Sequence, residues 1–236
     1  MFFGGFGPYL LFVVPPLLLG LWAQRRVRVN FERYDKVGTT AGLTGAQVAR
    51  RMLDSEGLYE VEVERVPGNL TDHYDPRGKV LRLSEATFDS RSVSAAGIAA
   101  HEMGHALQDA KGYGPLVLRS ALVPTVNIGS TWGTWMFMGG LLLTTFLGTQ
   151  LGFYIALAGL ALYTLVAFFA LVTLPVEFDA SRRAKALLTE HGILYKDEME
   201  GVNAVLNAAA LTYVAAAIQA IMQVLYWAFI LFGRRR

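Results

Sequence analysis

Long uncharged stretches alternate with polar stretches along this chain. Residues 1–24, 120–174 and 201–233 contain no Asp, Glu, Lys or Arg. A membrane-spanning helix needs about 20 apolar residues, so the first and third stretches each predict one span and the second predicts two. The second stretch would turn at residues 148–152, which include two glycines. The expected spans cover residues 2–23, 122–147, 153–174 and 211–232.

The N-terminal stretch is interpreted as an anchor rather than a cleaved signal peptide, because it lacks a basic start and an Ala-x-Ala exit. The chain is then expected to divide into five parts. These are an anchor over 1–24, a polar domain over 25–119, a transmembrane helical hairpin over 120–174, a helix over 175–203, and an Ala-rich, partly membrane-spanning helix over 204–236.

Four spans would put both termini on one side of the membrane and both polar regions on the other. Arg and Lys near span ends collect on the cytoplasmic side, and most of those in this chain flank the polar regions. This favours a polar domain facing the cytoplasm, in the cell membrane, although the basic triplet Arg234–Arg236 argues for the opposite orientation.

The polar domain has the pattern of a mixed α and β fold. Residues 44–57 predict a helix that begins with a capping-box sequence. Residues 58–66 alternate between polar and apolar side chains, which predicts a strand. A second strand is expected at 79–83 and a further helix over 92–111. The chain is therefore expected to be an α-helical integral membrane protein with a small α+β domain.

Composition excludes several classes of protein. The chain has 236 residues, 53% hydrophobic and 17% charged, and its 19 acidic residues all fall within 25–115 and 176–203. A soluble globular protein does not separate its charges in this way, and a disordered chain has fewer apolar residues. The absence of Cys excludes disulfides and thiolate metal sites. A net charge of +2 gives no reason to expect a nucleic acid partner.

The helix expected over 92–111 carries the sequence His101-Glu102-Met103-Gly104-His105. Residues i and i+4 lie on one helical face, so both imidazoles can bind one Zn²⁺ at about 2.0–2.1 Å. Glu102 points about 100° away from His101 around the helix and can reach a water at the metal without being a ligand. This spacing is typical of hydrolytic zinc sites. The competing interpretation is two surface histidines on a helix.

A hydrolytic zinc site needs a third protein ligand and an open position. His191 has the surroundings of a helix C-terminal cap, and His73 those of an ordinary turn residue. Glu177 is favoured, because the chain between His105 and Glu177 would cross the membrane twice and return to the same side. Asp179 lies about 200° from Glu177 around a helix, so both cannot face one ion in regular geometry.

Two blocks of sequence resemble those of a known family. The first is Ala-Ala-His-Glu-Met-Gly-His-Ala-Leu-Gln at 99–108, followed by Tyr-Gly-Pro-Leu at 113–116, and the second is Leu-Pro-Val-Glu-Phe-Asp-Ala-Ser-Arg-Arg-Ala at 174–184. With most of the chain, they are similar to the YugP-type neutral zinc metallopeptidases. The resemblance implies a membrane-bound zinc endopeptidase with a zincin-like (minigluzincin) domain and one Zn²⁺ per chain. It implies His101, His105 and Glu177 as ligands and Glu102 as the catalytic carboxylate.

The chain is also similar to the HtpX and CAAX-prenyl membrane proteases, whose second block commonly reads Glu-x-x-x-Asp. Ser181 occupies the Asp position here. We therefore expect Ser181 to take a weaker hydrogen-bonding role beside the metal ligands, with Asp179 as the less favoured substitute.

The expected reaction is hydrolysis of peptide bonds in membrane or membrane-proximal proteins, at the surface of the lipid bilayer. Candidates for stabilising the transition state, which the sequence does not rank, are His73, Tyr74, Tyr213 and Arg183. The strand near residues 80–83 is expected to pair with extended substrate. The competing function is a non-proteolytic zinc-binding membrane protein, such as a pseudoprotease or an adaptor of other proteases. An oligomer or a regulatory membrane partner is compatible with either function.

Overall fold

The computed structural model describes residues 6–233, which are mostly helical and include one small sheet. The chain forms two compact units. The first contains the described residues up to 22, residues 118–174, and those from 212 onward; the second contains 23–117 and 175–211. The beginning of the expected N-terminal span and the triplet Arg234–Arg236 lie outside the described residues.

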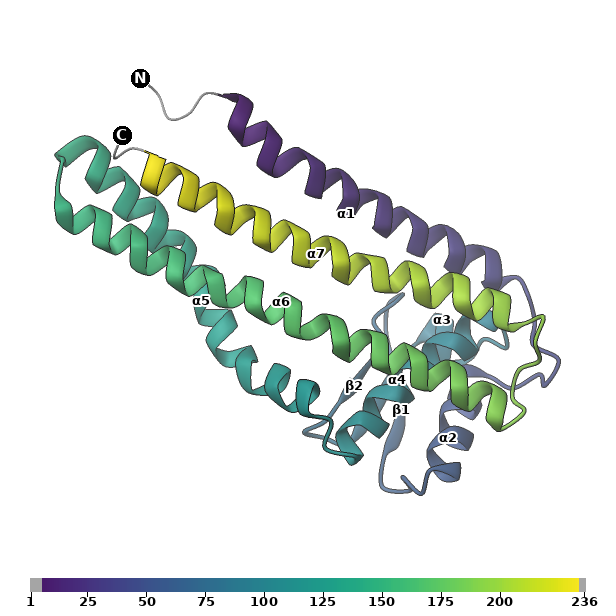
Figure 1. Ribbon diagram of the computed structural model, residues 1–236. Helices are drawn as coiled ribbons and strands as arrows, with labels where there is room; N and C mark the ends of the chain where they lie inside the picture. Colours follow the sequence, from purple (N-terminus) through teal and green to yellow (C-terminus); the bar gives the residue numbers. More distant parts are fainter. Residues whose placement is uncertain (1–5, 234–236) are drawn as a thin grey trace. The chain divides into compact units, whose positions relative to one another are not determined.

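Long helices make up the first unit (Figure 1). They are the N-terminal part of α1 (Phe6–Asp35), most of α5 (Gly114–Leu147), the first part of α6 (Gln150–Glu190) and the second part of α7 (Met199–Gly233).

Helices α5 and α6 form a tight hairpin within the first unit (Figure 1). Its turn contains Gly148 with a φ of 64°, a left-handed conformation that glycine adopts without steric cost. The two backbones touch, because a Cβ added to Gly159 of α6 would lie 2.4 Å from the backbone nitrogen of Phe137 in α5. Glycines at such a contact are typical of helix pairs packed inside membranes.

Three helices of the described chain are long and apolar enough to cross a membrane. They are Gly7–Asp35 of α1, Gln150–Glu190 of α6 and Met199–Gly233 of α7. Helix α5, in which the second of four spans was expected, is not among them. Its middle, residues 130–135, consists of Ser, Thr, Gly and Trp, which lower its mean hydropathy. The structure therefore supports three of the four predicted spans, and the fourth stays a prediction.

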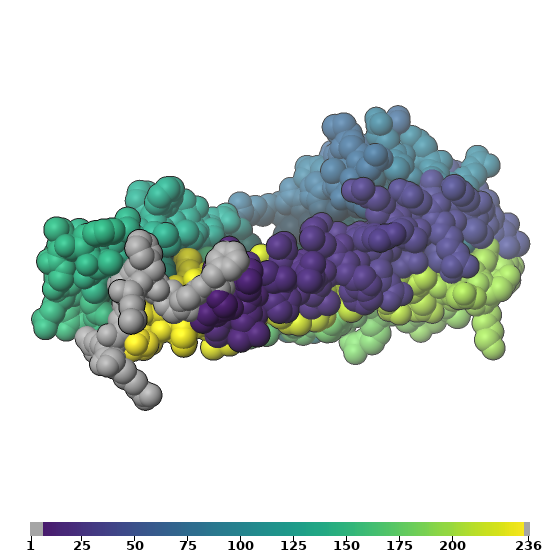
Figure 2. Space-filling view, turned by 90° about the horizontal axis from the view of Figure 1, so that it is seen from above, coloured from purple at the N-terminus to yellow at the C-terminus, as the bar shows by residue number. Residues whose placement is uncertain are grey.

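Helix α1 carries apolar side chains that no other part of the described chain covers. Leu11 is 66% exposed and Leu18 is 58% exposed. Figure 2 shows α1 (purple) at the surface along its length. Exposed leucines on the uncharged first part of this helix indicate contact with lipid rather than with water.

Helices α6 and α7 are separated at another position than the boundaries expected near residues 174 and 203. Helix α6 continues through Pro175 to Glu190, and α7 begins at Met199. The turn between them contains Gly192 with a φ of 58°. The predicted end of the span at Leu174 therefore does not mark a helix end.

The second unit contains a three-stranded sheet with the order β1-β3-β2. Strand β3 (Val80–Ser84) is parallel to β1 (Glu62–Val66) and antiparallel to β2 (His73–Asp75). The predicted strand at 79–83 thus lies in the middle of the sheet. The expectation that it pairs with substrate is wrong, since both of its edges are occupied, and Asp72 accepts a hydrogen bond from the backbone nitrogen of Ser84 at 2.8 Å.

Helices α2 (Gly45–Ser55), α3 (Glu85–Phe88) and α4 (Val93–Ala110) complete this unit together with the ends of α6 and α7 (Figure 1). The predicted capping box of α2 is confirmed by reciprocal hydrogen bonds between Thr44 and Gln47. The core between the helices and the sheet includes Met52, Leu81 and Met103, all fully buried.

Helix α4 lies in direct backbone contact with α6. A Cβ added to Gly104 would lie 2.6 Å from the carbonyl oxygen of Ala180. Glycine at this position therefore allows the spacing at which the side chains of α4 and α6 meet.

Candidate metal centre

Helix α4 presents its two histidines on one face. The hydroxyl of Ser92 caps the helix by accepting a hydrogen bond from the backbone nitrogen of Ala95 at 3.1 Å. The rings of His101 and His105, one helical turn apart, have centroids 4.8 Å apart. Both side chains are mostly buried, so these are not the two surface histidines of the competing interpretation.

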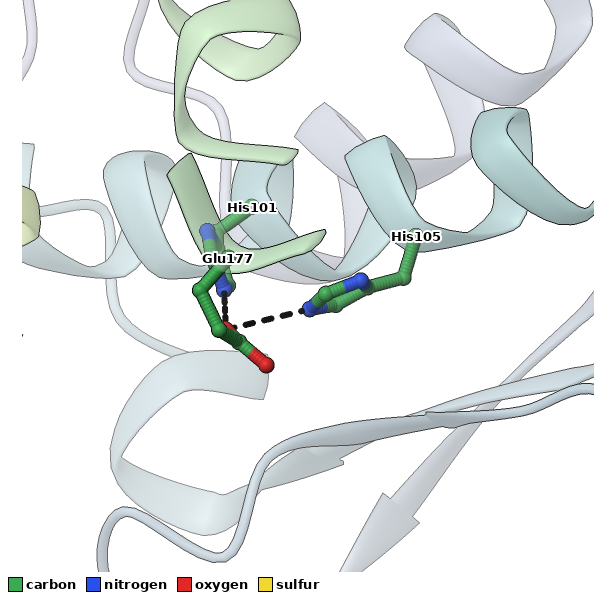
Figure 3. Close-up of side chains that lie close together, drawn as sticks. All are labelled: His101, His105 and Glu177. Carbon is green, nitrogen blue, oxygen red and sulfur yellow. Dashed lines mark hydrogen bonds and ion pairs between the residues drawn. The ribbon is translucent and has the colours of Figure 1, made fainter. Parts of the chain in front are cut away.

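Glu177 of α6 points at both rings (Figure 3). Its Oε2 lies 3.2 Å from Nε2 of His101 and 3.5 Å from Nε2 of His105. Two ligands held about 2.0–2.1 Å from a tetrahedral Zn²⁺ are themselves roughly 3.3 Å apart. Both distances from Glu177 therefore fit ligands of one zinc ion, and the three ligand atoms all lie within 4.8 Å of one another. Within residues 6–233, this is the group of His, Asp and Glu side chains that can hold a metal ion.

Glu102 lies beside this group with its carboxylate uncommitted. Across the described chain, no hydrogen bond or ion pair fixes this carboxylate, although the side chain is buried. Burial raises the pKa of the Glu102 carboxyl above its usual range, and the neighbouring His101 and His105 offset part of that rise. A carboxylate with a raised pKa accepts a proton from water more readily, which suits a general base.

The pKa of His105 results from opposing effects. Burial lowers it, but the hydrogen bond that the protonated ring donates to Glu177 and the negative charge of Glu102 outweigh burial, so the pKa is raised. The ring therefore lies in a negatively charged environment, as expected for a site that attracts a cation.

Each ring also has a partner on its other nitrogen. The hydroxyl of Ser181 lies 3.1 Å from Nδ1 of His101, and Oε1 of Gln108 lies 3.0 Å from Nδ1 of His105. In both histidines Nε2 is the nitrogen that faces Glu177. Such contacts orient histidine ligands. The structure thus brings Ser181 to the position that the sequence suggested.

Gln108 is the residue that the sequence analysis missed. A signal was present, since Gln108 follows His105 by three residues and therefore shares its helical face. It is also a polar residue on a helix of small apolar side chains, and it is fully buried.

Asp179 does not face the three ligand atoms. Its carboxylate accepts hydrogen bonds from Gln108, Arg182 and Arg183. The structure thus agrees with the angular argument that Asp179 and Glu177 cannot face one ion.

Three of the four candidates for stabilising a transition state are engaged elsewhere in the second unit. The guanidinium of Arg183 is paired with Asp179. The hydroxyl of Tyr74 donates to Asp109 at 2.9 Å, and burial together with Asp109 raises the pKa of Tyr74. Nδ1 of His73 lies 2.9 Å from the carbonyl oxygen of Thr71. The fourth candidate, Tyr213, belongs to the first unit.

The imidazole of His191 contacts residues at the C-terminal end of α2 and not the three candidate ligands. Its Nε2 is 3.1 Å from the hydroxyl of Ser55 and 3.8 Å from a carboxylate oxygen of Glu56. Neither His191 nor His73 belongs to the candidate metal group found in the described chain.

Apolar helices and a group of two histidines and a glutamate beside a free carboxylate define a membrane-associated protein with a candidate hydrolytic metal centre. Comparison with known proteins identifies the family. The chain belongs to the family described as "Putative neutral zinc metallopeptidase", whose model matches residues 9–232. The resemblance to YugP-type proteins is thereby confirmed.

A similar protein is the "Putative membrane protease YugP" of Bacillus subtilis (strain 168). It is 46% identical over 227 residues, which cover 96% of this chain and 98% of that protein. No solved structure matches this chain significantly. The name of this relative agrees with the membrane association indicated by the three apolar helices.

The close contact between α4 and α6 leads to a first prediction. We expect Gly104→Ala to lower both the unfolding temperature and the affinity for zinc, because the added methyl group would meet the backbone of Ala180. Overpacking of this kind costs about 1–3 kcal/mol. Thermal unfolding with and without zinc, together with a zinc titration, measures both effects.

Gly97→Ala on the same helix is the matched control. A Cβ at this position would lie 3.4 Å from a methyl group of Val202, which is an ordinary contact. Replacing a glycine inside a helix by alanine gains up to about 1 kcal/mol. We expect this variant to be at least as stable as the wild type, and equal behaviour of the two variants would contradict the argument.

Proposed function

We propose that this protein is a membrane-bound zinc endopeptidase with one Zn²⁺ per chain. The observation that carries the proposal is the convergence of His101, His105 and Glu177 beside the uncommitted carboxylate of Glu102. Its membership of a family described as neutral zinc metallopeptidases supports the same function.

In this proposal His101, His105 and Glu177 would hold the ion, and three protein ligands are the number found in catalytic rather than closed structural zinc sites. When bound, Zn²⁺ supplies a Lewis acid that polarises the scissile carbonyl. Glu102 accepts a proton from the attacking water and then delivers it to the nitrogen of the leaving amine. Ser181 and Gln108 hold the histidine rings in orientation while this proton moves.

The proposed substrates are membrane proteins or segments close to a membrane. Glu177 follows Leu174, the last residue of the predicted span over 153–174, by three positions on the same helix. A ligand so close to the expected membrane boundary supports a reacting bond near the bilayer surface. We propose four spans, with α5 as the least apolar, and a polar unit that faces the cytoplasm because most flanking Arg and Lys residues lie next to it.

The second candidate function is a zinc protein without proteolytic activity, such as a pseudoprotease or an adaptor. Structural zinc sites are normally closed by four protein ligands, whereas the candidate group in the described residues has three. A pseudoenzyme has no need of a buried, unbonded Glu102, whose burial is costly. Both observations favour hydrolysis.

Metal removal tests the proposal directly. We expect detergent-purified protein to cleave fluorescent casein, to lose cleavage with 1,10-phenanthroline, and to regain it when Zn²⁺ is added, because the Lewis acid is then removed and restored. Zinc bound without any cleavage would favour the adaptor function, and cleavage that resists the chelator would contradict a metallopeptidase.

A second arm of this experiment tests the substrate class. The same cleavable peptide is compared as a soluble molecule and as a lipid-anchored molecule, with the protein in vesicles. Faster cleavage of the anchored form supports substrates near the membrane, and equal rates would contradict that part of the proposal.

A further inference from the structure

Gln108 is a fully buried amide that joins the two helices of the metal centre. It lies on α4 and contacts His105 of the same helix. Its Nε2 donates to the carbonyl oxygen of Val176 at 2.8 Å and to a carboxylate oxygen of Asp179 at 2.9 Å, both on α6. Both the nitrogen and the oxygen of its amide therefore have partners inside the protein.

The partners on α6 fix the orientation of the amide. A carbonyl oxygen can only accept a hydrogen bond, and so can the carboxylate of Asp179, which is paired with Arg182 and Arg183. The NH₂ group of Gln108 must therefore face α6, and its oxygen must face His105. An amide turned the other way would place its oxygen against two acceptors.

The orientation of the amide in turn fixes the tautomer of His105. The Gln108 oxygen accepts only, so a neutral imidazole that donates to it carries its hydrogen on Nδ1. Nε2 is then left with a free lone pair, on the side of the ring that faces Glu177. A neutral histidine binds a metal through such a lone pair.

The same amide also holds the segment that carries the third ligand. Val176 precedes Glu177 directly, and Asp179 follows it by two positions. Two hydrogen bonds from Gln108 thus flank Glu177 in the sequence and tie its helical turn to α4.

We propose that Gln108 is a positioning residue that sets the tautomer of His105 and the location of Glu177 together. This inference rests on the proposed zinc site. Ser181 serves His101 differently, because its hydroxyl can either donate or accept and therefore does not impose a tautomer. Gln108 consequently has the larger share in preparing the site for metal.

Zinc affinity of two variants gives the first test. We expect Gln108→Leu to weaken zinc binding about 10–100-fold, the usual effect of losing a partner of a metal ligand, and Ser181→Ala to weaken it less. The absorption spectrum of the Co²⁺-loaded protein reports whether the coordination geometry changes as well. Wild-type affinity and spectrum in Gln108→Leu would overturn the proposal.

Two further variants, which exchange the amide and the carboxylate, test whether Gln108 acts through its hydrogen bonds or only through its packing. Gln108→Glu keeps an acceptor for His105 but sets oxygen against the acceptors Val176 and Asp179, so we expect weaker zinc binding. Adding Asp179→Asn provides an NH₂ donor to the new carboxylate, and we expect part of the affinity to return. If the double variant binds zinc no better than Gln108→Glu, the hydrogen-bonded bridge is not what positions the ligands.

The tautomer of His105 in the metal-free wild type tests the proposal even if a variant fails to fold. The chain has only four histidines, so ¹⁵N-histidine labelling at alkaline pH, where the ring is neutral, resolves them by NMR. The His105 signals are identified by their loss in His105→Asn. We expect hydrogen on Nδ1, and hydrogen on Nε2 would overturn the proposal.

These outcomes separate the inference from the proposed function. If the wild type does not bind zinc at all, the endopeptidase proposal falls, and the tautomer still tests the role of Gln108. If the wild type binds zinc and cleaves casein but the Gln108 variants match it, only the present inference falls.

Discussion

Glu102→Gln is expected to abolish peptide cleavage while zinc stays bound. The amide has nearly the shape of the carboxylate but cannot accept the proton of the attacking water. General bases contribute about 10²–10⁴-fold to the rates of enzymes, so we expect a loss within that range in kcat. Zinc content changes little, because the ligand atoms belong to His101, His105 and Glu177. Cleavage of casein and metal analysis of the same sample measure the two effects.

Glu62→Gln is the matched control for this prediction. Glu62 is an exposed glutamate on the edge strand β1 of the same unit, and the change removes the same charge. We expect wild-type cleavage in this control. Substantial cleavage in Glu102→Gln would remove the general base from the proposed mechanism, and loss of zinc from that variant would show that Glu102 is instead needed to build the site.

Helical spacing predicted the two histidines of the centre, and the expected path of the chain through the membrane predicted the glutamate. The positions of His101 and His105 follow from the period of the α-helix, which the structure reproduces with ring centroids 4.8 Å apart. Glu177 is 72 residues further along the chain than His105. It was identified by counting two membrane crossings between them and by the resemblance to a family, and the structure places it 3.5 Å from His105.

Features that depend on contacts between distant segments of the chain were not predicted from the sequence. Strand β2 has only three residues, too few to show a period of two. Its existence moves β3 from the edge of the sheet to the middle, and this is why the expected site for substrate pairing was wrong. Gln108 was missed for a related reason, because its importance comes from acceptors on α6 that are distant in sequence.

Hydropathy predicted apolar segments better than it predicted helix ends. Helix α6 continues from uncharged into charged sequence without a break, with Pro175 inside it. A proline inside a helix is tolerated where neighbouring groups satisfy the freed carbonyl. The predicted boundary at Leu174 is therefore not a helix end, and α6 continues without interruption from the apolar segment to Glu177.

Glu177→Ala is expected to differ from Glu102→Gln in its zinc content. In this variant zinc and cleavage are lost together. Removing a ligand weakens metal binding by more than the 10–100-fold typical of losing an outer hydrogen-bond partner, so we expect a decrease of at least about 100-fold. The buried side chain also lies against Nε2 of both histidine rings, and its truncation removes the third ligand atom from that group. Zinc titration monitored by competition with a coloured chelator measures the affinity.

Glu190→Ala controls for the loss of a glutamate from the same helix, since Glu190 is exposed at the end of α6. We expect it to bind zinc and cleave casein like the wild type. The two glutamate variants of the centre then distinguish its two tasks. Only a carboxylate that ligates changes zinc affinity, and only a carboxylate that moves a proton changes cleavage at full zinc occupancy. If Glu177→Ala retained wild-type zinc affinity, the ion would have to be held by another set of residues, and the proximity of Glu177 to His101 and His105 would need a different explanation.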